Sequence, residues 1–152
     1  QSNVAYTDAD SDTRILKLAR RVASETTPAP PQPLTQEAVF KARQAVLSVH
    51  MAEAVEAYIV QLVIATREPG AYDNELSDWL EFGASPRATI ALDRCARANA
   101  YLHGRDYVSP DDVQAVVTDC LKHRLILSFE AEAAGVTRAQ VINRLLETVA
   151  VG

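Results

Sequence analysis

The stretch from Gly83 to Tyr107 constrains the fold more than any other part of the sequence. It reads GASPRA at residues 83–88, continues as an alanine-rich run, and ends in GRDY at residues 104–107. A serine at the capping position, Pro86 at the first helical position and Gly104 after the run are typical of a helix with defined ends. The pattern therefore predicts a helix that begins at Ser85-Pro86 and ends before Gly104.

Arg87 is an unusual residue for the first turn of that helix. A cation there faces the positive end of the helix dipole, which costs roughly 0.3–1 kcal/mol. The same turn offers free backbone N–H groups to an anion. Two interpretations stay open: an ordinary solvated basic face, or a site where Arg87 reaches a phosphate. The other members of this face are Arg94, Arg97 and Tyr101.

A second face of the same helix carries mostly small residues at helical spacing. Small side chains allow a neighbouring helix to approach closely, so we expect this stripe to be buried. Its members are Ala88, Ala91, Leu92, Cys95, Asn99 and Leu102.

The composition fits one folded domain that is mainly helical. The 152 residues are 48% hydrophobic and only 6% aromatic, with five glycines, which indicates a core of aliphatic and alanine side chains. The net charge of -5 argues against general binding to nucleic acid or to an anionic membrane. The chain begins with Gln1 instead of methionine, so we expect it to be part of a longer protein.

The cysteines and histidines form no recognisable site. Cys95 and Cys120 lie in separate helical patterns, and we expect buried free thiols in a reducing compartment, with a disulfide as the alternative. The three histidines are scattered, so no metal site is predicted. No signal peptide is recognised, and the longest apolar run, near residues 57–65, is too short to cross a membrane. We therefore expect a cytoplasmic protein without membrane insertion.

A proline-rich stretch divides the chain at residues 26–33. Proline removes backbone donors and restricts its preceding neighbour, so we expect a solvent-facing extended connector, with a proline-rich docking segment as the alternative. Before it, Ser11 or Asp12 can cap a helix that runs to about Ser24. The apolar stripe of that helix is Ile15, Leu18, Ala19 and Val22.

Four more helices are predicted after the connector, with inward residues at helical spacing. The helix from Thr35 is expected to bury Ala38, Val39, Ala42, Val46 and Leu47. The next, which stops before Pro69, is expected to bury Ala54, Val55, Tyr58, Ile59, Leu62, Val63 and Ala65. Ser109 caps a helix with Val113, Val116, Val117, Cys120 and Leu121 inward, and Thr137 caps a last one with Val141, Ile142, Leu145, Leu146 and Val149 inward.

Two segments between these helices carry weaker patterns. Residues 124–129 gain β-branched character and predict a short strand, for which residues 49–51 are the expected partner. Residues 68–82 predict a polar loop that Trp79, Leu80 and Phe82 attach to the helices. The fold class is therefore mainly α, a helical bundle with at most one pair of very short strands.

Several catalytic motifs are missing from the sequence. It contains no Gly-x-x-x-x-Gly-Lys-Ser/Thr loop, no Gly-x-Ser-x-Gly and no Cys-x-x-Cys. Nothing in this chain alone can bind Mg²⁺-ATP in the P-loop manner, which argues against a self-contained enzyme.

Separate blocks of the sequence, in the same order, resemble the C-terminal part of the MoxR-type AAA+ ATPases. They are GASPRA at residues 83–88, GRDYV at 104–108, Pro110 with Asp112-Val113, and HRL at 123–125. Residues 58–67 resemble the family's stretch ahead of the first block, and the closing Val149-Ala150-Val151 resembles its usual ending. The resemblance covers nearly everything after the connector and, more loosely, residues 6–16.

The resemblance implies an AAA+ lid-type helical bundle that closes over a nucleotide at a subunit boundary of a ring, usually a hexamer. By this resemblance, Arg87 is the sensor-2 arginine of the full-length protein, and Ser85, Pro86 and Arg87 contact ATP. ATP and Mg²⁺ would be used by the full-length protein, with neither bound tightly by this chain alone. Expected partners are the protein's own ATPase core, neighbouring ring subunits and von Willebrand factor A domain proteins.

The resemblance also implies a division into three parts. Residues 1–27 would come from the end of the ATPase core or form a first lid helix, residues 28–34 would connect, and residues 35–152 would form the lid. The family is associated with chaperone-like assembly or maturation of protein complexes. Two alternatives remain: a helical protein-interaction bundle without a nucleotide role, and a small DNA-binding or histone-like module, against which the acidic balance argues.

Overall fold

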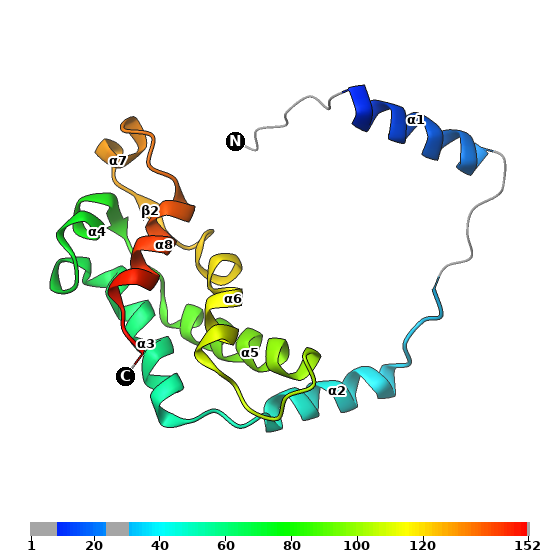
Figure 1. Cartoon of the computed structure of the whole chain (residues 1–152), viewed down its shortest axis with the longest axis horizontal. Helices are drawn as coiled ribbons and strands as arrows, with labels where there is room; N and C mark the ends of the chain where they lie inside the picture. Colours follow the sequence, from blue (N-terminus) through cyan, green and yellow to red (C-terminus); the bar gives the residue numbers. More distant parts are fainter. Residues whose placement is uncertain (1–8, 24–30, 152) are drawn as a thin grey trace. The chain divides into compact units, whose positions relative to one another are not determined.

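The structure, a computed structural model, describes residues 9–23 and 31–151. Two compact units divide at Thr35, the first covering Gln1–Thr35 and the second Gln36–Gly152, and each is described by itself (Figure 1). Of the predicted connector, residues 26–30 lie outside the described residues, and residues 31–35 form neither helix nor strand.

The first unit contains one helix, α1 (Ala9–Ala23), among its described residues. It begins before Ser11 and Asp12, so those residues lie in its first turn and neither is its cap. The predicted apolar stripe is exposed and not packed, since Ile15, Leu18 and Val22 are each more than half accessible.

The second unit is mainly α with one pair of short strands, as predicted (Figure 1). Its elements, in order, are α2 (Gln36–Ser48), α3 (Glu53–Arg67), the 3-10 helix η1 (Pro69–Ala71), α4 (Asn74–Trp79), β1 (Leu80–Phe82), α5 (Pro86–Leu102), α6 (Pro110–Leu121), β2 (Ile126–Leu127), α7 (Phe129–Ala133) and α8 (Arg138–Thr148). Among the described helices, none has the length and apolarity needed to cross a membrane.

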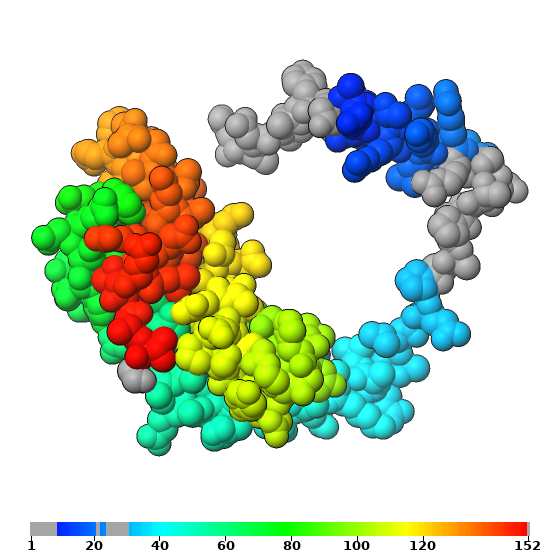
Figure 2. Space-filling view, in the orientation of Figure 1, coloured from blue at the N-terminus to red at the C-terminus, as the bar shows by residue number. Residues whose placement is uncertain are grey.

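The core lies between α3, α5, α6 and α8. Figure 2 shows α4 and α7 gathered at one end of this unit and α2 with α5 at the other. Large buried side chains come from α3, α6 and α8, and α5 contributes mainly alanine. The side chains with the least accessible surface include Tyr58, Ile59, Leu62, Leu92, Val113, Val117, Leu121, Ile142 and Leu145.

The buried face of α5 differs from the predicted stripe. Ala88, Leu92, Ala96 and Ala100 are fully buried at a spacing of four residues. Cys95 is exposed and Leu102 is 80% exposed, so the prediction was wrong for both. The buried face is thus rotated toward the alanines, whose small side chains allow α6, the most extensive partner of α5, to pack closely.

Helix α2 lies outside the core. None of its residues is buried, and Val39 and Leu47 are 42% and 63% exposed, so the predicted inward face was wrong at these positions. Ala38 is exposed as well, whereas Ala42 and Val46 are half-buried. Helix α3 follows its prediction except at Ala54, which is exposed.

The strand near residue 126 was predicted, but its partner was not. β2 pairs antiparallel with β1, with Leu80 opposite Leu127 and Phe82 opposite Ile126. The expected partner segment instead forms a single parallel bridge between His50 and Tyr107. The predicted polar loop contains η1, α4 and β1. Leu80 is buried and Trp79 half-buried in it, whereas Phe82 is 60% exposed.

The ends of α6 and α8 agree with the sequence. Pro110 opens α6, and the Thr137 hydroxyl accepts a hydrogen bond of 3.2 Å from the Gln140 N–H at the start of α8. The predicted inward residues of both helices are buried or half-buried. Helix α7, capped by Ser128, was not predicted.

Candidate functional site at the start of α5

The backbone just before α5 is held against the end of α3. The Ala84 N–H donates to the Thr66 hydroxyl at 2.9 Å, and Arg67 Nε donates to the Ala84 carbonyl at 2.6 Å. The Thr66 hydroxyl in turn donates to the Val63 carbonyl at 2.7 Å. Thr66 and Ala84 are each only 1% exposed. Both backbone groups of Ala84 are therefore used, which fixes where the helix begins.

Gly83 makes this close approach possible. A Cβ added at Gly83 would lie 2.1 Å from the Thr66 carbonyl oxygen and 2.7 Å from the Arg67 nitrogen. Because these neighbours are backbone atoms, no side-chain rotation relieves the clash. The glycine that opens the GASPRA block is thus required by the contact between the two segments.

The first turn of α5 is not closed by a side chain. Ser85 occupies the N-cap position with extended backbone angles, as predicted, but its side chain accepts no capping hydrogen bond. Pro86 takes the first helical position and no acidic residue follows in the turn. Such a helix start presents positive potential to whatever lies outside it.

Arg87 projects from this turn into solvent. It is exposed, as are Ser85 and Pro86, and the described carboxylates form no ion pair with it; the described ion pairs involve Lys41, Arg97, Arg105 and Arg144. Its guanidinium is therefore not turned inward against an acidic partner.

The remaining members of the predicted basic face do not form one site with Arg87. Arg94 is exposed. Arg97 is half-buried, and its Nε donates to Asp93 Oδ1 at 3.0 Å while its Nη1 donates to the Val49 carbonyl. Arg97 thereby ties α5 to the segment after α2, which is a structural role.

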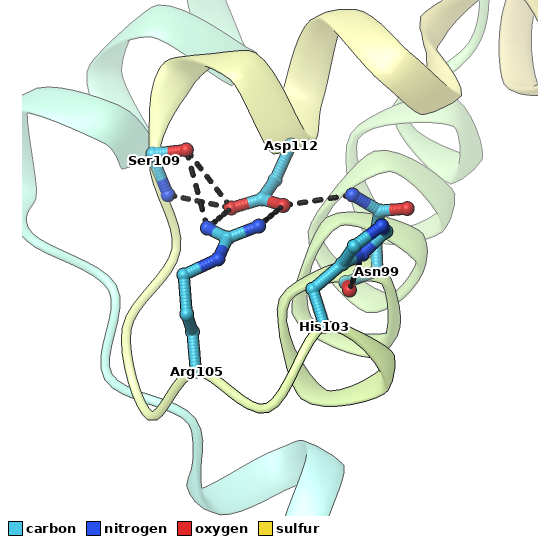
Figure 3. A network of polar contacts seen from close by, with 5 residues as sticks. All are labelled: Asn99, His103, Arg105, Ser109 and Asp112. Atoms are coloured by element: carbon cyan, nitrogen blue, oxygen red, sulfur yellow. Dashed lines mark hydrogen bonds and ion pairs between the residues drawn. The ribbon is translucent and has the colours of Figure 1, made fainter.

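A polar network closes the other end of α5 (Figure 3). Arg105 donates from both Nη atoms to the two oxygens of Asp112, each at 2.6 Å. Asp112 also accepts from Asn99 Nδ2 at 2.7 Å, from the Ser109 N–H at 2.8 Å and from the Ser109 hydroxyl at 3.0 Å. The sequence did not predict the pairing of Arg105 with Asp112, because it depends on the loop between α5 and α6.

Asp112 is a buried carboxylate that stays ionised. It is 1% exposed. Burial alone would raise its pKa, but the hydrogen bonds from Arg105, Ser109 and Asn99 outweigh burial and hold the pKa of Asp112 well below its ordinary value. With every oxygen satisfied by these donors, the network stabilises the fold and leaves no group free for chemistry.

The two cysteines are free thiols, as predicted, but only Cys120 is buried. Burial, together with the neighbouring Cys95, raises the pKa of Cys120 to about 12, so the thiolate is disfavoured. Over residues 9–23 and 31–151, no three His, Cys, Asp or Glu side chains are arranged to hold a metal ion.

Comparisons with known proteins show which family this chain resembles. Residues 76–145 match the family model described as the AAA lid domain. Chaperone MoxR1 of Mycobacterium tuberculosis is 47% identical over 94 residues, which cover 61% of this chain and 25% of MoxR1. Protein MoxR of Methylorubrum extorquens is 37% identical over 101 residues, covering 63% of this chain and 29% of that protein.

A solved structure is similar to this chain in fold. The crystal structure of a proposed ATPase from Cytophaga hutchinsonii matches with a TM-score of 0.85 and 36% identity, covering 98% of this chain and 45% of that one. The fold is that of an AAA lid, a small helical domain. The chain belongs to the MoxR-type AAA+ proteins and corresponds to their C-terminal helical lid. It spans 25% of MoxR1 and less than half of the solved neighbour.

Proposed function

We propose that this chain acts as the lid of a ring-forming AAA+ ATPase and supplies Arg87 as its sensor-2 arginine. The observation that carries the proposal is an exposed arginine in the first turn of a helix whose capping serine makes no capping bond. The core would hold ATP and Mg²⁺, and Arg87, beside Ser85 and Pro86, would face the terminal phosphates.

The role of Arg87 in this proposal is electrostatic. Charge develops on the phosphoryl oxygens during transfer, and a fixed guanidinium stabilises that charge. When the γ-phosphate leaves, Arg87 loses its strongest partner, and the lid turns relative to the core. The chemistry of hydrolysis belongs to the core, whereas this chain positions one cation and carries the movement.

The full-length protein would work as a homo-oligomeric ring, with a hexamer as the expected form, in the cytoplasm. Its task would be assembly or maturation of protein complexes together with von Willebrand factor A domain proteins. This part of the proposal rests on the similarity to proteins named MoxR, one of them described as a chaperone. We expect no nucleic-acid partner and no membrane insertion.

Arg87→Ala in the full-length ATPase tests the proposed role. We expect kcat for ATP to fall on the order of 10²-fold, the loss seen when a group aimed at developing charge is removed. Steady-state ATP turnover and thermal unfolding would be measured on the same preparations.

Arg94→Ala is the matched control, because Arg94 is an exposed arginine of the same helix. It should leave kcat within about twofold of wild type, since exposed substitutions away from special features change little. Equal turnover in the Arg87→Ala variant and the wild type would remove the assignment.

A protein-interaction bundle without a nucleotide role is the second candidate, favoured by one observation. Three large apolar side chains are exposed on β1, β2 and the start of α7: Phe82 at 60%, Ile126 at 51% and Phe129 at 79%. Phe82 lies opposite Ile126 in the strand pair, and neighbouring exposed apolar side chains often mark binding surfaces. If the Arg87 variant turned over ATP normally, this candidate would become the preferred one.

A further inference from the structure

Thr66 and Arg67 hold the segment that leads into α5, although neither lies on the helix that carries Arg87. From the end of α3, the Thr66 hydroxyl accepts from the Ala84 N–H at 2.9 Å and Arg67 Nε donates to the Ala84 carbonyl at 2.6 Å. Ala84 directly precedes Ser85, the N-cap residue of α5. These two contacts thus act on the backbone three residues before Arg87.

The hydrogen bonds to Ala84 restrain the backbone before α5, whereas the Arg87 side chain is exposed and pairs with none of the described carboxylates. Thr66 is 1% exposed, and its hydroxyl both accepts from Ala84 and donates to the Val63 carbonyl. A hydroxyl used as donor and acceptor has one fixed orientation. Gly83 lies directly against the Thr66 carbonyl, so the backbone segment that leads into α5 has no room to shift toward α3.

The hydrogen bond from Arg67 is directed at Ala84. Its Nε–H is a single donor pointing at one carbonyl, and the rest of the exposed guanidinium forms no ion pair with the described carboxylates. Surface ion pairs contribute little to stability, so charge pairing does not account for the position of this side chain. Here the side chain instead reaches across 17 positions of sequence to a backbone oxygen.

We propose that Thr66 and Arg67 are positioning residues for the sensor arginine: they set the place and direction of the first turn of α5, and hence of Arg87. This inference rests on the proposed function. Catalytic arginines must be held closely, because a misplacement of about 1 Å can cost on the order of 10²-fold in rate. Neither residue is required to touch the nucleotide.

The local part of the inference can be tested in this chain alone by backbone hydrogen exchange. Thr66→Val keeps the shape of the side chain but removes the hydroxyl, so the Ala84 amide should exchange about two- to tenfold faster. Thr66→Ser restores the hydroxyl and should restore slow exchange. The Leu76 amide, bonded to Asp73 Oδ1 at 2.9 Å, is the internal control and should stay unchanged.

The functional part needs the full-length ATPase and a double-mutant cycle. Thr66→Val and Arg67→Ala should each lower kcat for ATP by about tenfold or more while changing KM less, and Thr66→Ser should recover the wild-type kcat. If both residues act through Arg87, adding either change to Arg87→Ala should lower kcat no further.

The possible results separate the two claims. If Arg87→Ala leaves turnover unchanged, the proposed function fails, whatever the hydrogen exchange of Ala84 shows. If Arg87→Ala lowers kcat but Thr66→Val does not, or if the losses multiply in the double variants, the positioning role is wrong while the sensor role stands. An unchanged Ala84 exchange rate in Thr66→Val would overturn the anchoring itself.

Discussion

Helices α5 and α6 both start with Ser-Pro, yet the two starts are built in opposite ways. At α6, Asp112 in the first turn accepts from the Ser109 N–H and hydroxyl and from Arg105. At α5, the corresponding turn has no acidic residue, the Ser85 side chain makes no capping bond, and Arg87 is exposed. A helix N-terminus whose polar groups are hydrogen-bonded within the protein stabilises the fold. A helix N-terminus without such partners is available to a ligand.

The largest change in the free energy of unfolding should come from removing the carboxylate in the first turn of α6. Asp112→Asn removes the buried carboxylate and leaves Arg105 without its partner, so we expect the free energy of unfolding to fall by roughly 3 kcal/mol. Urea denaturation of this chain would measure it. Asp111→Asn, a change at the exposed neighbour in the same turn, is the control and should cost less than about 0.5 kcal/mol.

A smaller change in stability should follow when the pH is lowered and Asp112 becomes protonated. The pKa of Asp112 is lower in the folded chain than in the unfolded one, so its stabilising contribution is fully present above the unfolded value of about 3.9. As pH falls below about 4, the contribution is lost progressively toward the folded pKa. The stability difference between wild type and Asp112→Asn should therefore be constant from neutral pH to about pH 5 and shrink below about pH 4. A constant difference down to about pH 2 would contradict the assigned pKa shift.

The smallest effects should appear at the α5 start. Arg87→Gln removes a cation from the positive end of a helix and should raise the free energy of unfolding by about 0.3–1 kcal/mol.

Ser85→Ala should change the free energy of unfolding by less than about 0.5 kcal/mol because no capping bond is lost. Thr137→Ala removes a capping bond at α8 and should lower the free energy of unfolding by about 1 kcal/mol. Equal losses for the two capping changes would mean that the α5 start is closed after all.

Local sequence patterns predicted what depends on neighbouring residues. The starts of α5, α6 and α8 follow from capping serine or threonine and from proline at the first position, and all three lie where expected. The end of α5 follows from Gly104, whose φ of 72° favours glycine. Residue types with strong positional preferences need no knowledge of distant contacts.

Contacts between distant segments were not predictable in this way. The pairing of β1 with β2 joins residues more than forty apart, and the short β1 strand has little pattern of its own. The anchoring of Ala84 by Thr66 and Arg67 was missed because a threonine and an arginine at a helix end have many common roles. The exposed state of α2 also contradicted its pattern, since apolar spacing predicts a face but not whether a neighbour covers it.

The alanine spacing of α5 has a mechanical consequence. Because Ala88, Ala96 and Ala100 leave little side-chain bulk on the buried face of α5, α6 can pack closely against it, and the helix of 17 residues is a rod of about 25 Å. Arg87 sits at one tip of this rod and the Arg105–Asp112 pair secures the other. If α5 tilted at the end that carries Arg87, the loop between α5 and α6 at its other end would therefore move as well.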